Sequence, residues 1–309
     1  MINEKTDTFI QLEKADQGVK RFKHHAMATI FEILIVHDNP NYAEQSAYAA
    51  FQELDRLELE LSRFIENSDV SRINQLKSGA SIIVGPDTFS CLKACAELYR
   101  DTNGYFDITR GLIFDFWKKK ISQLPTDMDE VKEPSFPWLK IDENTFSVEK
   151  VKSGISLDLG GFGKGYAIDK MWDILREWDI KNYLLHGGGS TVFARSEADY
   201  LKWTVSIGID SGNNKLLDLN NFALSGSGLN KGPHIINPKT GQPVSGRKAA
   251  WAKAESAAVS DALSTAFMLM SENEIQKFIQ THQNSGGIIC ETNSEMKMFG
   301  EWVFSSSVT

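Results

Sequence analysis

The sequence has few cysteines and no long run of apolar residues. Cys91, Cys95 and Cys290 are too few, and odd in number, for a disulfide framework. Cys91 and Cys95 lie one helical turn apart without further metal ligands nearby, so we expect small buried thiols there. No stretch approaches about 18 apolar residues, so no transmembrane segment is expected.

Basic residues are also scarce relative to acidic ones. The chain has 33 Lys and Arg residues against 41 Asp and Glu, a formal net charge of −8. This balance argues against a nucleic-acid partner. A phosphate-rich ligand would therefore need help from a metal ion or from backbone amides.

The N-terminal segment, residues 1–25, lacks the apolar stretch that an export signal requires. The chain as it stands therefore predicts a cytoplasmic protein, or an exported one if a signal sequence has been removed. The first cysteine is Cys91, so no lipoprotein attachment site is visible. With 309 residues, of which 41% are hydrophobic, the chain can form a sizeable core.

Apolar periodicity predicts interleaved helices and strands without a regular βαβ rhythm. We expect helices at 43–64, 88–102, 165–178, 260–270 and 274–282, and a surface loop at 121–137. We expect strands at 27–36, 138–150 (a hairpin), 155–159, 182–194, 203–209, 217–228, 248–257, 286–290 and 295–299. Several neighbouring strands resemble hairpins, which favours the α+β class with largely antiparallel sheets.

The most conspicuous motif is the glycine-rich stretch SLDLGGFGKGYAIDK at residues 156–170. A P-loop would need Ser or Thr after Gly163-Lys164, but Gly165 stands there, so the Mg²⁺-binding hydroxyl is missing. A dinucleotide fingerprint would need G-x-G-x-x-G, whereas this stretch has G-x-G-x-G. Glycines nevertheless allow backbone to approach a ligand closely, and a helix N-terminus favours negative charge. The alternative is a tight turn without a ligand.

Three further segments carry polar residues in a glycine-rich setting. His234 and Asn237 lie between the turns of SGSGLNKGPHIINPKTGQPV, where a histidine can be either structural or functional. Asp261 and Thr265 are four residues apart on one helix face, an arrangement that suits a hard cation such as Mg²⁺. Alternatively, Asp261 lies in the first helical turn as a dipole partner and Thr265 packs. HGGGS at 186–190 predicts another turn with exposed backbone.

Taken together and in order, these segments resemble the FAD:protein FMN transferases, the ApbE flavin transferase family. The resemblance covers about residues 26–300 and includes MATIFEI, LSRFIENSDVSRINQ, GYFDITRGLIFDFW, the glycine stretch, HIINPKTGQPV and SDALSTAF. It implies a T-fold-like domain of two intertwined α/β lobes over residues 26–309, preceded by an N-terminal extension at 1–25, with the active site in a cleft.

The resemblance also implies a reaction and a set of site residues. FAD would be a substrate, and its FMN half would move to a Thr or Ser hydroxyl of an acceptor flavoprotein with release of AMP. Asp261 and Thr265 would bind Mg²⁺ together with the backbone carbonyl of Gly163, and His234 and Asp261 would be the catalytic residues. The implied FAD-binding residues are Asn74, Asp107, Thr109, Gly161, Lys164, Asp169 and Gly188.

The chain departs from the family pattern at two places. Many members have Gly-Gly-Asp where this chain has Gly188, Gly189 and Ser190, and the segment between Ser227 and His234 is shorter than usual. The shorter segment lacks aromatic and basic residues that would border an acceptor. Two alternatives therefore stay open, a Mg²⁺-dependent FAD pyrophosphatase that forms FMN and AMP, and an FAD-binding protein without turnover.

Overall fold

The structure, a computed structural model, describes residues 10–12, 18–119, 136–198, 201–208, 215–229, 232 and 234–305. Within these residues, the largest sheet has the strand order β14-β13-β12-β11-β8-β7-β3-β2, and every neighbouring pair is antiparallel. Its strands are β2 (Lys20–Ala26), β3 (Thr29–Val36), β7 (Asn182–Gly187), β8 (Thr191–Arg195), β11 (Phe222–Gly228), β12 (Arg247–Ala254), β13 (Gly286–Glu291) and β14 (Met296–Phe299).

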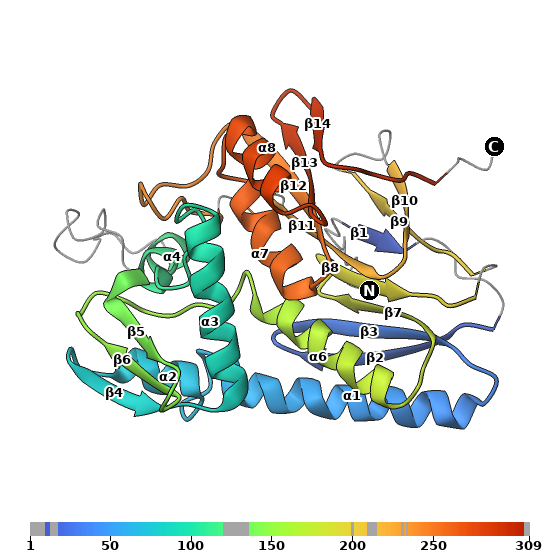
Figure 1. Ribbon diagram of the computed structural model, residues 1–309, viewed down its shortest axis with the longest axis horizontal. Helices are drawn as coiled ribbons and strands as arrows, with labels where there is room; N and C mark the ends of the chain where they lie inside the picture. The colour runs from blue at the N-terminus through green and yellow to red at the C-terminus, as the bar shows by residue number, and fades with distance from the viewer. Residues whose placement is uncertain are drawn as a thin grey trace.

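Helices cover one face of this sheet, because alternate strand residues are apolar on that side. Phe31, Ile33 and Ile35 of β3 lie in the same buried cluster as Leu54 and Met171 from the helices above them. Figure 1 shows α1 and α6 running along the lower strands, with α7 over the upper ones. The helices are α1 (Pro40–Leu61), α6 (Gly163–Glu177), α7 (Ala257–Phe267) and α8 (Glu272–Thr281).

A second sheet covers the opposite face and closes a second core. It has the order β1-β9-β10, with β1 (Ile10–Leu12), β9 (Trp203–Ile207) and β10 (Lys215–Leu219). Leu34 and Leu184 point to this side and pack with Trp203 and Trp251 in a separate buried cluster. The main sheet is thus buried on both faces, by helices on one and by strands on the other.

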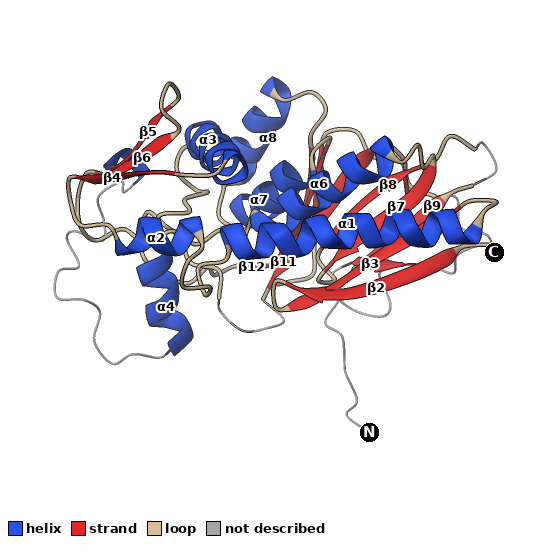
Figure 2. Cartoon of the chain, turned by 90° about the horizontal axis from the view of Figure 1, so that it is seen from below, coloured by secondary structure: helices blue, strands red, loops and turns tan. Residues whose placement is uncertain are grey.

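A smaller group of elements lies at one end of the molecule (Figures 1 and 2). Its sheet has the order β4-β6-β5. The group comprises α2 (Asp69–Gln75), β4 (Ala80–Ile83), α3 (Pro86–Asp101), α4 (Gly111–Lys119), the 3₁₀ helix Phe136–Trp138, β5 (Leu139–Asp142) and β6 (Ser147–Lys150). Across the described residues, no helix is long and apolar enough to cross a membrane.

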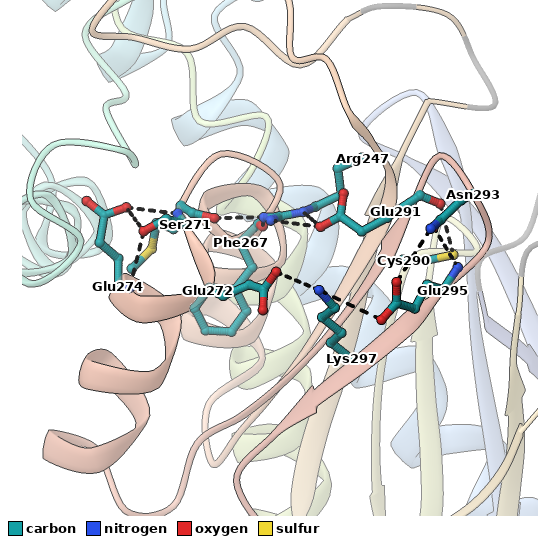
Figure 3. Close-up of polar contacts among 11 residues, drawn as sticks. Arg247, Phe267, Ser271, Glu272, Glu274, Cys290, Glu291, Asn293, Glu295 and Lys297 are labelled. Carbon is teal, nitrogen blue, oxygen red and sulfur yellow. Dashed lines mark hydrogen bonds and ion pairs between the residues drawn. The ribbon is translucent and has the colours of Figure 1, made fainter.

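Both ends of α7 are held by charges of the sign that a helix dipole favours, partly buried at the start and buried at the end. At the N-terminal end, Asp169 of α6 accepts hydrogen bonds from the backbone N–H groups of Ala257 and Ala258. At the C-terminal end, Arg247 Nη1 donates to the carbonyl oxygens of Phe267 and Met270. Figure 3 shows this guanidinium lying between the end of α7 and Glu291 of β13. These contacts fix α7 against α6 and the sheet.

The α+β class with largely antiparallel sheets is confirmed, and most predicted elements are present. The predicted strand at 155–159 is wrong, because this segment forms only an isolated bridge, Ser156 to Arg110. The predicted boundary between residues 25 and 26 falls inside β2, which pairs with β3 along its whole length. The predicted loop at 121–137 lies mostly outside the described residues.

Candidate active site

A cavity of about 340 Å³ opens between the glycine-rich loop, the C-terminal half of β11 and α7. Strand β3 begins at its edge, and the segment 105–108 and the loop 234–238 complete its wall. Residues predicted for the site and found lining this cavity are Asp107, Gly161, Lys164, Gly188, His234, Asp261 and Thr265. Segments that are far apart in the sequence therefore meet here.

Helix α7 presents Asp261 and Thr265 to the cavity from successive turns. The helix begins at Ala257 after its N-cap, Ser256, whose hydroxyl accepts from the Val259 N–H. Asp261 is therefore beyond the first turn, which excludes the interpretation of this carboxylate as a simple dipole partner. The side chain is only 3% exposed, although it belongs to a polar cavity wall. Burying a carboxylate in this way is costly unless a cation or donors compensate it.

Two donors from the start of α6 face the Asp261 carboxylate. Lys164 Nζ lies 3.3 Å from Asp261 Oδ2, and the Gly165 N–H donates to the same oxygen at 3.3 Å. Lys164 Nζ also donates to the Gly160 carbonyl oxygen at 2.9 Å. The glycine-rich loop and α7 are thus joined through one carboxylate and one ammonium group.

The glycines of the loop allow this close approach. A Cβ at Gly165 would lie 2.2 Å from the Ala257 carbonyl oxygen, so no side chain fits where α6 crosses the start of α7. A Cβ at Gly161 would lie 3.3 Å from Thr265 Oγ1 at the cavity wall. Gly165 therefore serves helix packing, whereas Gly161 keeps backbone beside the hydroxyl of Thr265.

Hydroxyl groups form a second layer around Thr265. Ser227 Oγ of β11 lies 3.2 Å from Thr265 Oγ1 and 2.8 Å from Ser264 Oγ. Ser227 lines the cavity, whereas Ser264 is fully buried. The strand and the helix therefore fix the rotamer of the predicted metal-binding hydroxyl.

His234 lines the cavity from an exposed loop. Its Nδ1 lies 2.9 Å from the Gly232 carbonyl oxygen, and this contact orients the ring. The shortened segment between Ser227 and His234 lies partly outside the described residues.

Asn74 and Thr109 do not line this cavity. Asn74 Nδ2 donates to the Leu157 carbonyl at 3.1 Å, and Asn74 Oδ1 accepts from the Leu157 N–H at 2.6 Å. The Thr109 N–H and hydroxyl both donate to Asp107 Oδ1, at 2.9 and 2.6 Å. These side chains therefore hold the start of the glycine-rich stretch and the Asp107 carboxylate in place.

Asp169 and Gly163 also lie outside the residues that line the cavity. Asp169 caps α7 and accepts from the Ser256 hydroxyl at 2.6 Å. Burial raises the pKa of Asp169 to about 6, against the opposing effect of its hydrogen bonds. Gly163 is the first residue of α6, and its N–H donates to the Leu159 carbonyl oxygen. The role of the Gly163 carbonyl oxygen as a metal ligand stays a prediction.

Some cavity residues were not predicted. They are Ala28, Thr29, Tyr105, Phe106, Ile108, Phe114, Asp158, Gly160, Ser190, Gly226, Ser227, Gly228, Ile235, Ile236 and Pro238. Asp158 accepts from the Gly160 N–H at 2.8 Å and pairs with Arg63 at 2.9 Å. Most of these residues lie next to a motif that was recognised in the sequence. Extending each motif by a few residues would therefore have identified them. Tyr105 contributes a ring under Lys239 Nζ, 3.5 Å from the ring centroid, and no sequence pattern indicated that pair.

Residues 27–289 match the ApbE family. The chain belongs to the ApbE family. It is 25% identical over 304 residues to the FAD:protein FMN transferase of Vibrio cholerae, covering 90% of this chain and 89% of the relative. It is 23% identical over 261 residues to the FAD:protein FMN transferase of Haemophilus influenzae, covering 76% of this chain and 75% of the relative.

Solved structures of ApbE proteins share the fold. The ApbE protein of Thermotoga maritima superposes with a TM-score of 0.77 and 24% identity, covering 91% of this chain and 97% of that one. The apo form of the Pseudomonas stutzeri flavinyl transferase ApbE superposes with a TM-score of 0.78 and 22% identity, covering 94% and 95%. The expected ApbE-like architecture is therefore confirmed.

Proposed function

We propose that this protein is a Mg²⁺-dependent FAD:protein FMN transferase. It would move FMN from FAD onto a Thr or Ser hydroxyl of an acceptor protein and release AMP. The observation that carries the proposal is the meeting of Asp261 and Thr265 with the Gly161–Lys164 loop in one cavity. Family membership and relatives named FAD:protein FMN transferase support it.

The donor set fits Mg²⁺ better than a softer metal. Among the described residues, no three His, Cys, Asp or Glu side chains cluster as metal ligands. Mg²⁺ needs no such cluster, because it commonly takes one or two carboxylates and completes its octahedron with water and substrate phosphates. Asp261 would supply the carboxylate, Thr265 the hydroxyl and the glycine-rich loop a carbonyl oxygen. Bound there, Mg²⁺ would neutralise charge on the pyrophosphate.

The protein's own groups account for the remaining requirements of phosphoryl transfer. Attack of the acceptor oxygen on the FMN-side phosphorus breaks the bond to AMP, and negative charge grows on the phosphoryl oxygens. Lys164, which lines the cavity, would stabilise this charge. His234, which lines the cavity and whose Nδ1 lies 2.9 Å from the Gly232 carbonyl oxygen, would take the proton of the acceptor hydroxyl.

One experiment separates transfer from the alternatives. The protein is incubated with FAD and Mg²⁺, with and without a Thr-containing acceptor domain, and AMP and acceptor mass are followed. Transfer predicts AMP together with an acceptor that gains the mass of FMN. AMP without an acceptor would instead support FAD hydrolysis, and bound FAD without either product would support a carrier protein. Asp261→Asn should abolish product formation in either enzymatic case.

A further inference from the structure

The ammonium group of Lys164 lies between two oxygen atoms that would suit a metal ion. Its Nζ is 2.9 Å from the Gly160 carbonyl oxygen and 3.3 Å from Asp261 Oδ2. Asp261 is 3% exposed, so its charge needs a partner inside the protein. Lys164 is a cation that already meets this need, and it contacts the carboxylate that is also the expected Mg²⁺ ligand.

The contact of Lys164 with Asp261 is longer than its contact with the Gly160 carbonyl oxygen, 3.3 Å against 2.9 Å. A charge-assisted N–H···O bond is usually about 2.7–2.9 Å long, so 3.3 Å is long for such a pair. The lysine stem lies in the cavity, because a Cβ on Gly188 would lie 3.5 Å from Lys164 Cδ. The flexible four-carbon side chain of Lys164 allows the ammonium group to move while the backbone of this residue stays fixed in α6.

We propose that Lys164 is an exchangeable partner of Asp261. Its ammonium group neutralises the carboxylate while no metal is bound, and it turns into the cavity toward the substrate phosphates when Mg²⁺ binds. Two cations cannot occupy the same oxygen ligands, since their repulsion at this separation is strong. This inference rests on the proposed Mg²⁺ dependence and adds a coupling to it. Metal binding would free the positive charge that then binds the pyrophosphate.

The test uses Mn²⁺ alone as the probe, without FAD, and measures free Mn²⁺ by electron paramagnetic resonance. Lys164→Met should bind Mn²⁺ roughly three- to tenfold more tightly than the unmodified protein, because no internal cation competes. The matched control is Lys170→Met on the same helix. It removes the same charge, but Lys170 pairs with Asp87 at 2.9 Å, away from the cavity. Its Mn²⁺ affinity should stay unchanged.

Thermal unfolding distinguishes an exchangeable partner from a merely nearby charge. Without metal, Lys164→Met should unfold at a lower temperature than the unmodified protein, because Asp261 loses its cation. Saturating Mn²⁺ should remove that difference. Equal or weaker Mn²⁺ binding by Lys164→Met, or an unchanged unfolding temperature without metal, would overturn the proposal.

The Mn²⁺-binding measurements also distinguish a failure of the exchange proposal from a failure of the proposed function. Mn²⁺ binding that disappears in Asp261→Asn, with equal affinities for Lys164→Met and the unmodified protein, rejects the exchange alone. Failure of the unmodified protein to bind Mn²⁺ rejects both the exchange and the metal assignment.

Discussion

The charged groups at the two ends of α7 and the carboxylate on its cavity-facing side differ in the number and length of their hydrogen bonds. At the ends, Asp169 accepts three hydrogen bonds of 2.6–3.0 Å, and Arg247 donates to two backbone carbonyls and to Glu291. On the cavity side, Asp261 has two donors, and both lie at 3.3 Å. Charges that are fully hydrogen-bonded hold the helix, whereas the loosely bonded carboxylate is available to a ligand.

This difference separates stability from activity within a single helix of 11 residues. Substitutions at the ends should unfold the protein, and substitutions on the cavity side should stop the reaction without unfolding it. The first three of the following four predictions test that separation, and the fourth gives the effect of a charge away from α7.

The largest effect is expected for Asp261→Asn. FMN transfer should fall by at least about a thousandfold, which corresponds to about 4 kcal/mol of transition-state stabilisation. The free energy of unfolding should change by less than about 1 kcal/mol, because the amide is isosteric and the contacts that it replaces are long. Initial rates and urea unfolding measure the two quantities. A variant that is unfolded, or one that retains its rate, contradicts the prediction.

Arg247→Met should lower the free energy of unfolding by about 3 kcal/mol. The substitution leaves two carbonyl oxygens at the end of α7 and the Glu291 carboxylate without their buried cation. Lys248→Met is the control on the same strand, because Lys248 reaches only the Ser294 hydroxyl at an exposed position. Urea unfolding of the two variants measures the difference. The folded fraction of Arg247→Met should keep a near-normal FAD affinity, and a specific loss of FAD binding would place this arginine in the site.

Asp169→Asn should cost about 2 kcal/mol of stability. An amide presents one acceptor oxygen, so at least one donor among the Ser256 hydroxyl and the first N–H groups of α7 is left unpaired. Asp173→Asn on the same helix is the control, since Asp173 pairs with Arg176 at the surface. Denaturant unfolding at pH 7 compares them. Equal stability of the two variants would show that the cap at the start of α7 is dispensable.

The smallest effect concerns acid stability and lies away from α7. Contacts with His186 and, at 2.8 Å, with Lys23 lower the pKa of Glu32 to about 2, against the opposing effect of burial. A lowered carboxyl pKa contributes stability above its ordinary value near 4.5, and this contribution is lost as the pH falls toward 2. Glu32→Gln should remove roughly 1–2 kcal/mol at pH 7 and flatten this pH dependence. Unfolding between pH 2 and 7 measures it, and Glu44→Gln, at an exposed position of α1, should leave it intact.

The sequence predicted the elements whose apolar period matches their burial. The helix around Leu54 and the strands around Ile33 and Leu185 are examples, since each has a continuous apolar side. Residues 20–25 were not recognised as a strand, because Lys20, Lys23, His24 and His25 interrupt any apolar alternation. The turn that pairs β2 with β3 is made by Met27 and Ala28 at φ 51° and 57°, without the Gly or Asn that usually marks such a hairpin.

Site residues were predictable where a side chain able to bind a metal ion also belongs to a recognisable motif. Asp261 and Thr265 are such residues, and the structure places them together at the cavity. Asn74 and Asp169 were assigned to FAD binding, but their polar groups are occupied by Leu157 and by the start of α7. A motif shows that a polar residue is required, but not whether its partner is a ligand or the backbone. That distinction depends on tertiary contacts.

The pairing of β3 with β7 limits how early the main sheet can form while the chain is being synthesised. Phe31 lies opposite Gly187, so β3 can pair with β7 only after about three fifths of the chain has left the ribosome. Pairings between such distant residues are slow to form, since the loop must close before any contact stabilises it. The strands that flank α7 come later still, and β12 and β13 complete the sheet above it. The cavity therefore assembles near the end of folding, and a nascent chain stalled before residue 257 would leave exposed to aggregation the part of the sheet that α7 covers.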